Sequence, residues 1–442
     1  MKERLASLAQ ALRLPDVRRR ILFVMYMFGA YVACAHVPLP GIDKDQLANL
    51  FSGGGLGDIL NTFAGGSLKR FSVLALGIMP YINASIIFQL LVMAIPQLEA
   101  LQKEGEYGQK KINAWTKYLT VALALLQAVG MIGWFKSGGA FSGDPFITIF
   151  DVIMMAAGTS FLMWMGDLIT ERGIGQGISL IIFAGIMASL PQQISQTAIM
   201  MNSGQIGLAN VAFLMLIFVA TIYGIVKVQQ AQRKIPVQYA KRVKGNKVYG
   251  GQSSFLPLRV NQAGVIPIIF AISIALFPAT VANFFRAPGI IAAFGKIGIS
   301  EEAVSNGLFS IVEFTTPGQH PVASLLYFIL VVVFTYFYTA VTFNPEQIAE
   351  NLQKNGGAIP GIRPGERTRD YLDKILYRIT LAGALFLGTI AIMQYYVGDI
   401  TRVTTFDLVG GTSLLIVVGV ALDTMQQVEA QLMMRHYKGF LS

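Results

Sequence analysis

Ten long apolar runs dominate this sequence and restrict the folds open to it. A membrane-spanning α-helix needs about 20 mainly apolar residues. The runs lie at residues 21–37, 71–95, 118–135, 146–166, 173–190, 207–226, 262–285, 321–343, 375–397 and 408–428. Charged residues make up only 13% of the chain, which is too few to cover a water-soluble surface, since soluble domains carry about 25%. The sequence therefore predicts an all-α membrane protein with ten transmembrane helices.

The same runs exclude a membrane β-barrel. Barrel strands alternate apolar and polar residues over segments of about ten residues, whereas residues 325–334 are apolar at every position. We expect an N-terminal half over residues 21–200 and a C-terminal half over 201–430, each with five spans. Because five is odd, the halves would enter the membrane in opposite directions, which is the arrangement of inverted repeats with a working site between them.

Basic residues indicate the orientation of these spans. If the N-terminus is cytoplasmic, the cytoplasmic segments hold 27 of the 34 Lys and Arg residues and the outer segments hold seven. The positive-inside rule then predicts a cytoplasmic N-terminal segment at 1–20 and a cytoplasmic tail at 431–442. This placement accounts for the net charge of +10 (34 minus 24) without a nucleic-acid partner.

Four connecting segments stand out between the runs. Residues 53–66 are glycine-rich, and only their middle is expected to form a helix, too short to span. The loop 227–260 holds eight basic residues and no acidic one, and the loop 344–374 mixes both charges around two glycines and two prolines. The outer loop 286–320 contains no motif that we can assign. The first three segments are therefore the candidates for specialised roles.

Chemistry that is absent narrows the function classes. Charges within a membrane mark ion and proton pathways, yet Asp151, Asp167 and Asp423 all lie towards the ends of their runs. This argues against a coupled secondary transporter of small solutes, the alternative that stays open for uncharged or facilitative transport. No nucleophile elbow, phosphate loop or carboxylate pair is present, and the chain's one cysteine and three histidines give no metal-ligand spacing. We therefore expect no enzyme, no cofactor and no metal.

Isoleucines recur at helical spacing in two of the runs. Ile78, Ile82 and Ile86 lie four residues apart, as do Ile178 and Ile182, so each set occupies one face of a helix. On periodicity alone, these stripes are typical of packing or lipid-facing surfaces.

Four ordered segments resemble the signature segments of the bacterial SecY family. They are residues 76–87 (LGIMPYINASII), 163–179 (MWMGDLITERGIGQGIS), 359–366 (IPGIRPGE) and 410–416 (GGTSLLI). The resemblance runs from about residue 18 to about residue 435. It implies a protein-conducting channel of the bacterial inner membrane that passes unfolded secretory polypeptides across the membrane and releases transmembrane segments sideways into lipid.

The resemblance also assigns parts of that channel. It implies a central hourglass pore whose waist is a ring of aliphatic side chains, by position Ile78, Ile82, Ile178, Ile182, Ile269 and Ile416. Such a constriction can block ions by dewetting. The stretch 56–67 matches the family's plug, with Leu56, Ile59, Leu60, Phe63, Gly65 and Gly66 as its candidate residues; without the resemblance, an ordinary outer loop is the favoured interpretation.

Gate and docking positions follow in the same way. The family opens between its second and seventh spans, where Asn83, Ile86, Gln127 and Asn261 are the matching positions. The motor ATPase SecA or the ribosome would dock on Arg233, Lys234, Lys241, Arg242 and Arg363, although an arginine at a loop tip also serves simply to solvate the loop. SecE-like and SecG-like small membrane subunits, signal peptides and lipid are the other implied partners.

Overall fold

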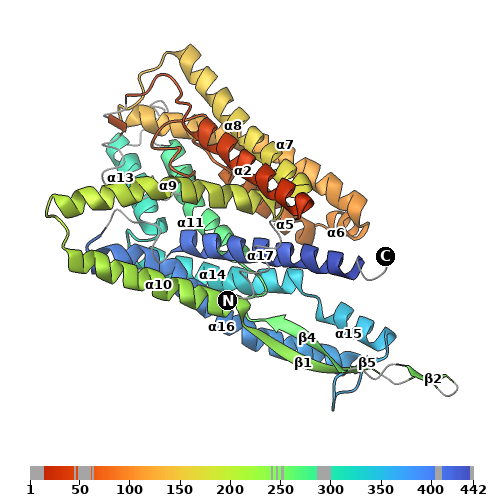
Figure 1. The fold of residues 1–442 in the computed structure, drawn as a ribbon. Helices are drawn as coiled ribbons and strands as arrows, with labels where there is room; N and C mark the ends of the chain where they lie inside the picture. Colours follow the sequence, from red (N-terminus) through yellow and green to blue (C-terminus); the bar gives the residue numbers. More distant parts are fainter. Residues whose placement is uncertain are drawn as a thin grey trace.

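The computed structural model describes residues 14–43, 46–47, 61, 64–239, 242–244, 247–249, 253–285, 300–403 and 411–438. Long helices form a bundle, and a small sheet with helix α15 projects from one end of it (Figure 1). The helices are α2 (Pro15–Ala35), α5 (Met79–Ala94), α6 (Pro96–Lys103), α7 (Glu106–Ser137), α8 (Pro145–Arg172), α9 (Gly177–Asn202), α10 (Leu208–Gln230), α11 (Ile266–Phe285), α13 (Glu301–Thr315), α14 (Pro321–Thr342), α15 (Pro345–Lys354), α16 (Glu366–Thr401) and α17 (Thr412–Lys438).

The chain is a mostly helical membrane protein. Within the described residues, seven helices are long and apolar enough to cross a membrane alone. An eighth is reached if α5 and α6, bent by 100° at their junction, count as one span. A helix overlaps each of the ten predicted runs. However, α2 is not among the helices that are long and apolar enough to cross a membrane, and the apolar part of α11, Ile266–Ala282, is too short.

The second predicted run, 71–95, is only partly helical. Phe71 and residues 73–78 form turns, Ser72 forms an isolated β-bridge with Pro38, and α5 begins at Met79. Gly77 has a φ of +56°, a left-handed conformation that suits glycine. Pro80 lies in the first turn of α5, where the amide hydrogen that proline lacks would have no partner within the helix. The helix therefore starts two residues beyond the glycine rather than at the start of the apolar run.

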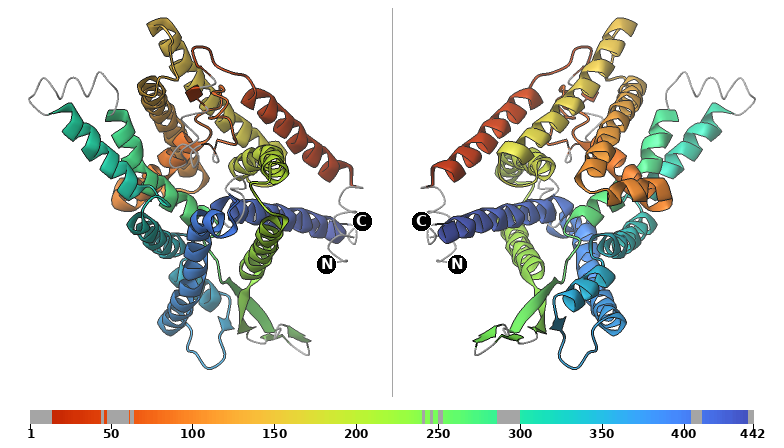
Figure 2. Two further views of the ribbon diagram at one scale, coloured as in Figure 1. Left: turned by 90° about the vertical axis from the view of Figure 1, so that its left-hand side faces the viewer. Right: turned by 90° about the vertical axis from the view of Figure 1, so that its right-hand side faces the viewer.

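The expectation of an all-α fold is wrong outside the bundle. The basic loop 227–260 contains strands β1 (Gln232–Tyr239), β2 (Arg242–Lys244), β3 (Lys247–Tyr249) and β4 (Ser253–Arg259). With β5 (Gly357–Ala358), β1 and β4 form an antiparallel sheet in the order β4-β1-β5, and β2 pairs with β3. The sheet projects from the helices in both side views (Figure 2). These residues lack a long apolar run, so backbone pairing between strands satisfies their amides instead.

Two other loops contain helices that were not predicted. Helix α13 lies in the loop 286–320, and α15 lies in the loop 344–374. Asn344 caps α15, since its side-chain oxygen accepts a hydrogen bond from the Gln347 amide at 3.1 Å. This is the ordinary role of asparagine at a helix start. Both helices are short and amphipathic, so a scan for long apolar runs overlooks them.

Candidate functional site

The isoleucines of the predicted ring lie in one hydrophobic core cluster. Five are buried, with at most 8% of their surface exposed, and the sixth, Ile178, is partly buried against the same cluster. The five buried members are Ile78, Ile82, Ile182, Ile269 and Ile416. The cluster is larger than this set and also holds Tyr31 and Tyr327. Shared burial is therefore an observed property of these residues, and their role as a ring stays a prediction.

Four helices, two from each half, carry these side chains. Ile78 and Ile82 lie at the start of α5, Ile178 and Ile182 at the start of α9, Ile269 near the start of α11 and Ile416 near the start of α17. Helix α11 contacts α5 and α7, and α17 contacts α9. The two halves of the chain thus meet through the helices that carry these isoleucines.

Close backbone packing fixes the start of α9 against α8. A Cβ on Gly177 would lie 1.8 Å from the carbonyl oxygen of Gly166, so only glycine fits there. The Thr170 hydroxyl accepts a hydrogen bond from the Gly177 amide and donates one to the Gly166 carbonyl, both at 2.9 Å. Gly177 therefore serves helix packing, and this packing sets the position of Ile178.

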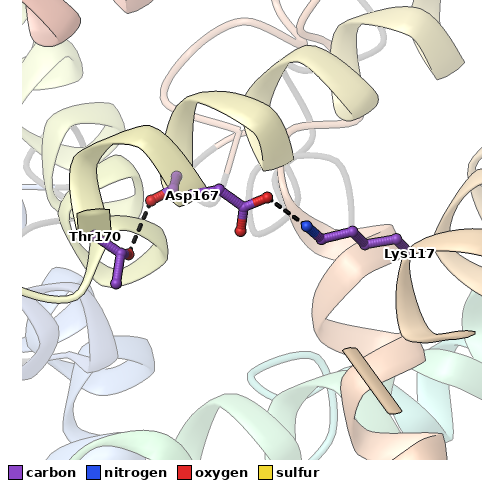
Figure 3. A network of polar contacts seen from close by, with 4 residues as sticks. Lys117, Asp167 and Thr170 are labelled. Atoms are coloured by element: carbon purple, nitrogen blue, oxygen red, sulfur yellow. Dashed lines mark hydrogen bonds and ion pairs between the residues drawn. The ribbon is translucent and has the colours of Figure 1, made fainter. Parts of the chain in front are cut away.

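An ion pair joins α7 to α8 next to Gly166, the residue that packs against the start of α9. The Lys117 ammonium donates to Asp167 Oδ2 at 2.5 Å, and Figure 3 shows both side chains bridging the two helices, with Thr170 one turn away. Both side chains are a little over 40% exposed. The sequence drew attention to Asp167 only as a charge near the end of a run. Its partner lies 50 residues away in the chain, so no local pattern indicated the pair.

Two of the predicted plug residues, Gly65 and Gly66, belong to a segment packed between α2 and α9. The Tyr31 hydroxyl of α2 donates to the Ala64 carbonyl at 3.4 Å. Gly65 and Gly66 both have positive φ, +64° and +79°. A Cβ on Gly65 would lie 2.6 Å from the Cα of Gly185 on α9. The remaining candidates, Leu56, Ile59, Leu60 and Phe63, lie outside the described residues.

The predicted gate residues are only partly brought together. Asn83 on α5 and Gln127 on α7 are half-buried, and Ile86 is buried. Asn261 precedes α11, and its side-chain amide donates to the Gly264 carbonyl at 2.9 Å. Within the described part of the chain, no hydrogen bond links Asn83, Gln127 and Asn261 to one another.

The sheet unites two loops that are far apart in sequence. Gln238 and Tyr239 of β1 pair with Ala358 and Gly357 of β5. This pairing brings the strand that carries Arg233 and Lys234 next to the loop that carries Arg363.

The basic side chains on these two loops face solvent. Arg233, Lys234 and Arg363 are exposed. Arg242 belongs to β2, and Lys241 lies outside the described residues. Ile235 and Val237 are buried and lie two residues apart in β1. Apolar residues at this spacing are typical of a strand, and they are the pattern in the sequence that could have indicated β1.

Comparisons with known proteins support one family. The SecY family model matches residues 72–425. The chain is 43% identical over 444 residues to the protein translocase subunit SecY of Halalkalibacterium halodurans, covering 98% of this chain and 99% of that protein. It is 44% identical over 443 residues to the SecY of Thermus thermophilus, covering 98% and 96%, and 41% identical over 445 residues to that of Bacillus subtilis, covering 98% and 99%.

Solved structures agree on the fold. A protein-conducting channel superimposes with a TM-score of 0.65 at 17% identity, covering 95% of this chain and 96% of that one. A SecY protein with a plug domain that stabilises the closed channel gives a TM-score of 0.62 at 16% identity, over 95% and 96% of the two chains. The resemblance of the four signature segments is thereby confirmed. This chain belongs to the SecY family of protein translocase channel subunits.

Proposed function

We propose that this channel subunit passes unfolded secretory polypeptides through a constriction lined by the six isoleucines. The observation that carries the proposal is their convergence in one cluster at the contact between helices of the two halves. A narrow aliphatic constriction excludes water and ions, while flexible aliphatic side chains can surround any passing sequence. Membership of the family makes the chain a channel subunit rather than an enzyme.

The ten-span, two-half organisation belongs to this proposal. The seven helices that qualify as spans and the bent pair α5 and α6 would be completed by α2 and by the short apolar helix α11. Five spans in each half, over residues 21–200 and 201–430, would make the halves inverted repeats around an hourglass pore. The contacts of α11 with α5 and of α17 with α9 support this arrangement.

The plug would be the stretch 56–67, which fills one funnel of the pore at rest. Support comes from its described end, where Gly65 and Gly66 adopt positive φ and Gly65 packs against Gly185. Glycine tolerates such conformations without steric cost. Release of this end would have to break the Tyr31 hydrogen bond to the Ala64 carbonyl and the close packing of Gly65 on Gly185.

Lateral release would occur between α5 and α7 on one side and α11 on the other. The contacts of α11 with both helices support this position. Asn83, Ile86 and Gln127 are the gate candidates on α5 and α7. Asn261 would join them only after its bond to Gly264 is exchanged. Interhelical hydrogen bonds in membranes average only about 0.6 kcal/mol, which suits a gate that a signal peptide can open into lipid.

The sheet and the loop at Arg363 would dock the energy-supplying partner, SecA or the ribosome. The β1 to β5 pairing supports one joint surface, since it ties Arg233 and Lys234 to the Arg363 loop. Basic side chains can bind rRNA phosphates or acidic protein patches. Among the neighbours in fold, Sec61 was solved in a ribosome-channel complex and Ssh1 on the yeast 80S ribosome. SecE-like and SecG-like subunits would complete the assembly.

The proposed orientation of the chain in the membrane rests on the same basic loops. With both termini cytoplasmic, the eight basic residues of the loop 227–260 and the loop around Arg363 face the cytoplasm, as the positive-inside rule requires. We place the chain in the bacterial inner membrane on this ground and on its family membership.

Reconstitution into vesicles tests the proposal. The full chain with its co-purifying subunits should move an unfolded preprotein into the vesicle lumen, and this movement should require SecA and ATP. Protection of the preprotein from added protease measures it. Flux of a small solute without SecA, combined with no protected preprotein, would instead favour a secondary transporter and contradict the proposal.

A further inference from the structure

A cavity of about 590 Å³ lies between α14 and α16, away from the isoleucine cluster. Its apolar lining includes Ala340 and Phe343 at the end of α14 and Leu376 of α16. Its polar lining comes mainly from α16. No role in the channel described above uses this cavity.

Two exposed cations line the cavity from one face of α16. Lys374 and Arg378 are four residues apart, so they lie one above the other on the helix. Within the described residues neither makes an ion pair. Among the described lining residues, Asp373 is the one carboxylate. With all three groups ionised, the lining carries a net charge of +1 (two minus one).

Tyrosines place the cavity at the membrane boundary. Tyr336 of α14 and Tyr377 of α16 both line it, their ring centroids 5.1 Å apart, and the Tyr336 hydroxyl donates to the Tyr377 carbonyl at 3.2 Å. Tyrosine is enriched at the level of lipid headgroups. Charged residues are frequent in α16 up to Arg378, and residues 379–393 contain none. The cations therefore lie where the apolar part of α16 begins.

An apolar seam continues from the cavity towards the membrane interior. Helices α14 and α16 pack side by side. On α14, Val333 is 53% and Ile329 48% exposed, and on α16, Leu381 and Leu385 are each 45% exposed. These side chains lie beyond the two tyrosines, on the apolar side. Lipid acyl chains can cover such a surface.

We propose that this cavity binds the headgroup of an anionic glycerophospholipid, with its acyl chains along the α14 and α16 seam. Lys374 and Arg378 would bind the phosphate, since basic pockets between transmembrane helices bind anionic headgroups. A lipid of charge −1 with a hydroxyl headgroup, such as phosphatidylglycerol, neutralises the lining, and its hydroxyls can donate to Asp373. A zwitterionic lipid leaves the excess charge of +1 uncompensated.

Lipid retention measured by native mass spectrometry tests the site. The full chain with its co-purifying subunits is equilibrated in equal amounts of phosphatidylglycerol, phosphatidylethanolamine and phosphatidylcholine. Phosphatidylglycerol should be retained preferentially. The variant Lys374→Gln/Arg378→Gln should weaken its retention by about fivefold for each cation removed. Asp373→Asn should strengthen it, an opposite effect that a folding defect would not produce.

A matched control removes two lysines elsewhere. Lys103 and Lys354 lie on α6 and α15, outside the cavity, and each pairs with a glutamate one turn away. Lys103→Gln/Lys354→Gln should leave retention unchanged. Equal loss in both double variants, or equal retention of the three lipids by the unmodified chain, would overturn the proposal.

Photo-crosslinking identifies the occupant directly. A photoreactive phenylalanine in place of Tyr377, which is 67% exposed, should form a phosphatidylglycerol adduct. Capture of a membrane subunit or of a second copy of this chain at this position would mean that protein covers the cavity, and the lipid assignment would be wrong.

Discussion

Gly65 and Gly185 are in backbone contact: a Cβ on Gly65 would lie 2.6 Å from the Cα of Gly185. Gly65 has a φ of +64°, so alanine there suffers both strain and a clash with backbone atoms that cannot move aside. The strain of a left-handed residue alone costs about 1–2 kcal/mol.

Gly65→Ala should therefore lower thermal stability and make the resting channel leak ions. The matched control is Gly66→Ala. Gly66 has a similar φ of +79°, but among the described residues the nearest atom to its Cβ position is 4.0 Å away. The control pays the strain without the clash. Melting in nanodiscs and iodide leak from vesicles measure the difference, and equal leaks for the two variants would show that the Gly65 to Gly185 contact does not hold the seal.

The pair of Lys117 and Asp167 predicts a charge-dependent link between α7 and α8. Because both side chains are over 40% exposed, solvent screening limits the pair to about 0.5–1 kcal/mol. Lys117→Asp or Asp167→Lys alone should lower the melting temperature, and the double exchange should restore most of it.

The comparison pair is Lys110 with Glu106, which is 3.3 Å apart and 75% or more exposed on both sides. Reversing the charge of Lys110, of Glu106 or of both should change the melting temperature little. Raising the salt concentration should reduce the Lys117 effect further. A double exchange no more stable than the single variants would mean that the two charges act independently.

Cysteine crosslinking tests whether the isoleucine cluster surrounds the translocating chain. Cys34 is the only cysteine, so a Cys34→Ser background is free of competing thiols. Ile82→Cys and Ile269→Cys should each form a disulfide with a cysteine in a preprotein stalled midway. Ile153→Cys on α8 is the control, since that side chain is 56% exposed on the bundle exterior. Crosslinking from Ile153 as strong as from Ile82 would place the path elsewhere.

Arg363→Glu should abolish SecA-driven transport while leaving the protein folded. The side chain is exposed, and among the described residues the contact of Arg363 is through its carbonyl, which accepts a hydrogen bond from the Thr368 hydroxyl at 3.0 Å. Charge reversal therefore disturbs the surface and not the loop. Lys136→Glu, an exposed reversal in the last turn of α7, should retain transport. ATP-dependent protection of a preprotein is the readout, and normal activity of Arg363→Glu would remove this residue from the docking site.

Asn83→Leu should make the channel stricter towards defective signal sequences. The Asn83 side chain is half-buried and makes no hydrogen bond to the described residues, and an amide partly withdrawn from water without a partner loses hydrogen-bond energy. Leucine of similar size removes that cost and favours the closed packing of α5. Export of a substrate with a weakened signal should fall relative to Ile87→Leu, a change at a more exposed position on the same helix. Unchanged export would argue against a gating role.

The sequence by itself determined the class of protein and its family. Runs of about 20 apolar residues commit each segment to helix, since a lipid environment leaves backbone amides no other partner. The four signature segments, read in order, identified the SecY family and pointed to Arg363 and the isoleucines. Both kinds of information are local, because they depend on consecutive residues.

Only the tertiary structure decided which distant residues meet. Three contacts join segments that are far apart in the sequence: Gly65 with Gly185, Lys117 with Asp167, and β1 with β5. Each contact depends on how whole helices and strands pack. The sheet was not predicted because the alternation of apolar and polar residues in β1 is short and is a weaker signal than the long apolar runs. Which residue contacts which depends on the packing of every element that lies between them in the sequence. Side-chain type and spacing therefore identified candidates such as Asp167, whereas the folded bundle determined which residues they contact.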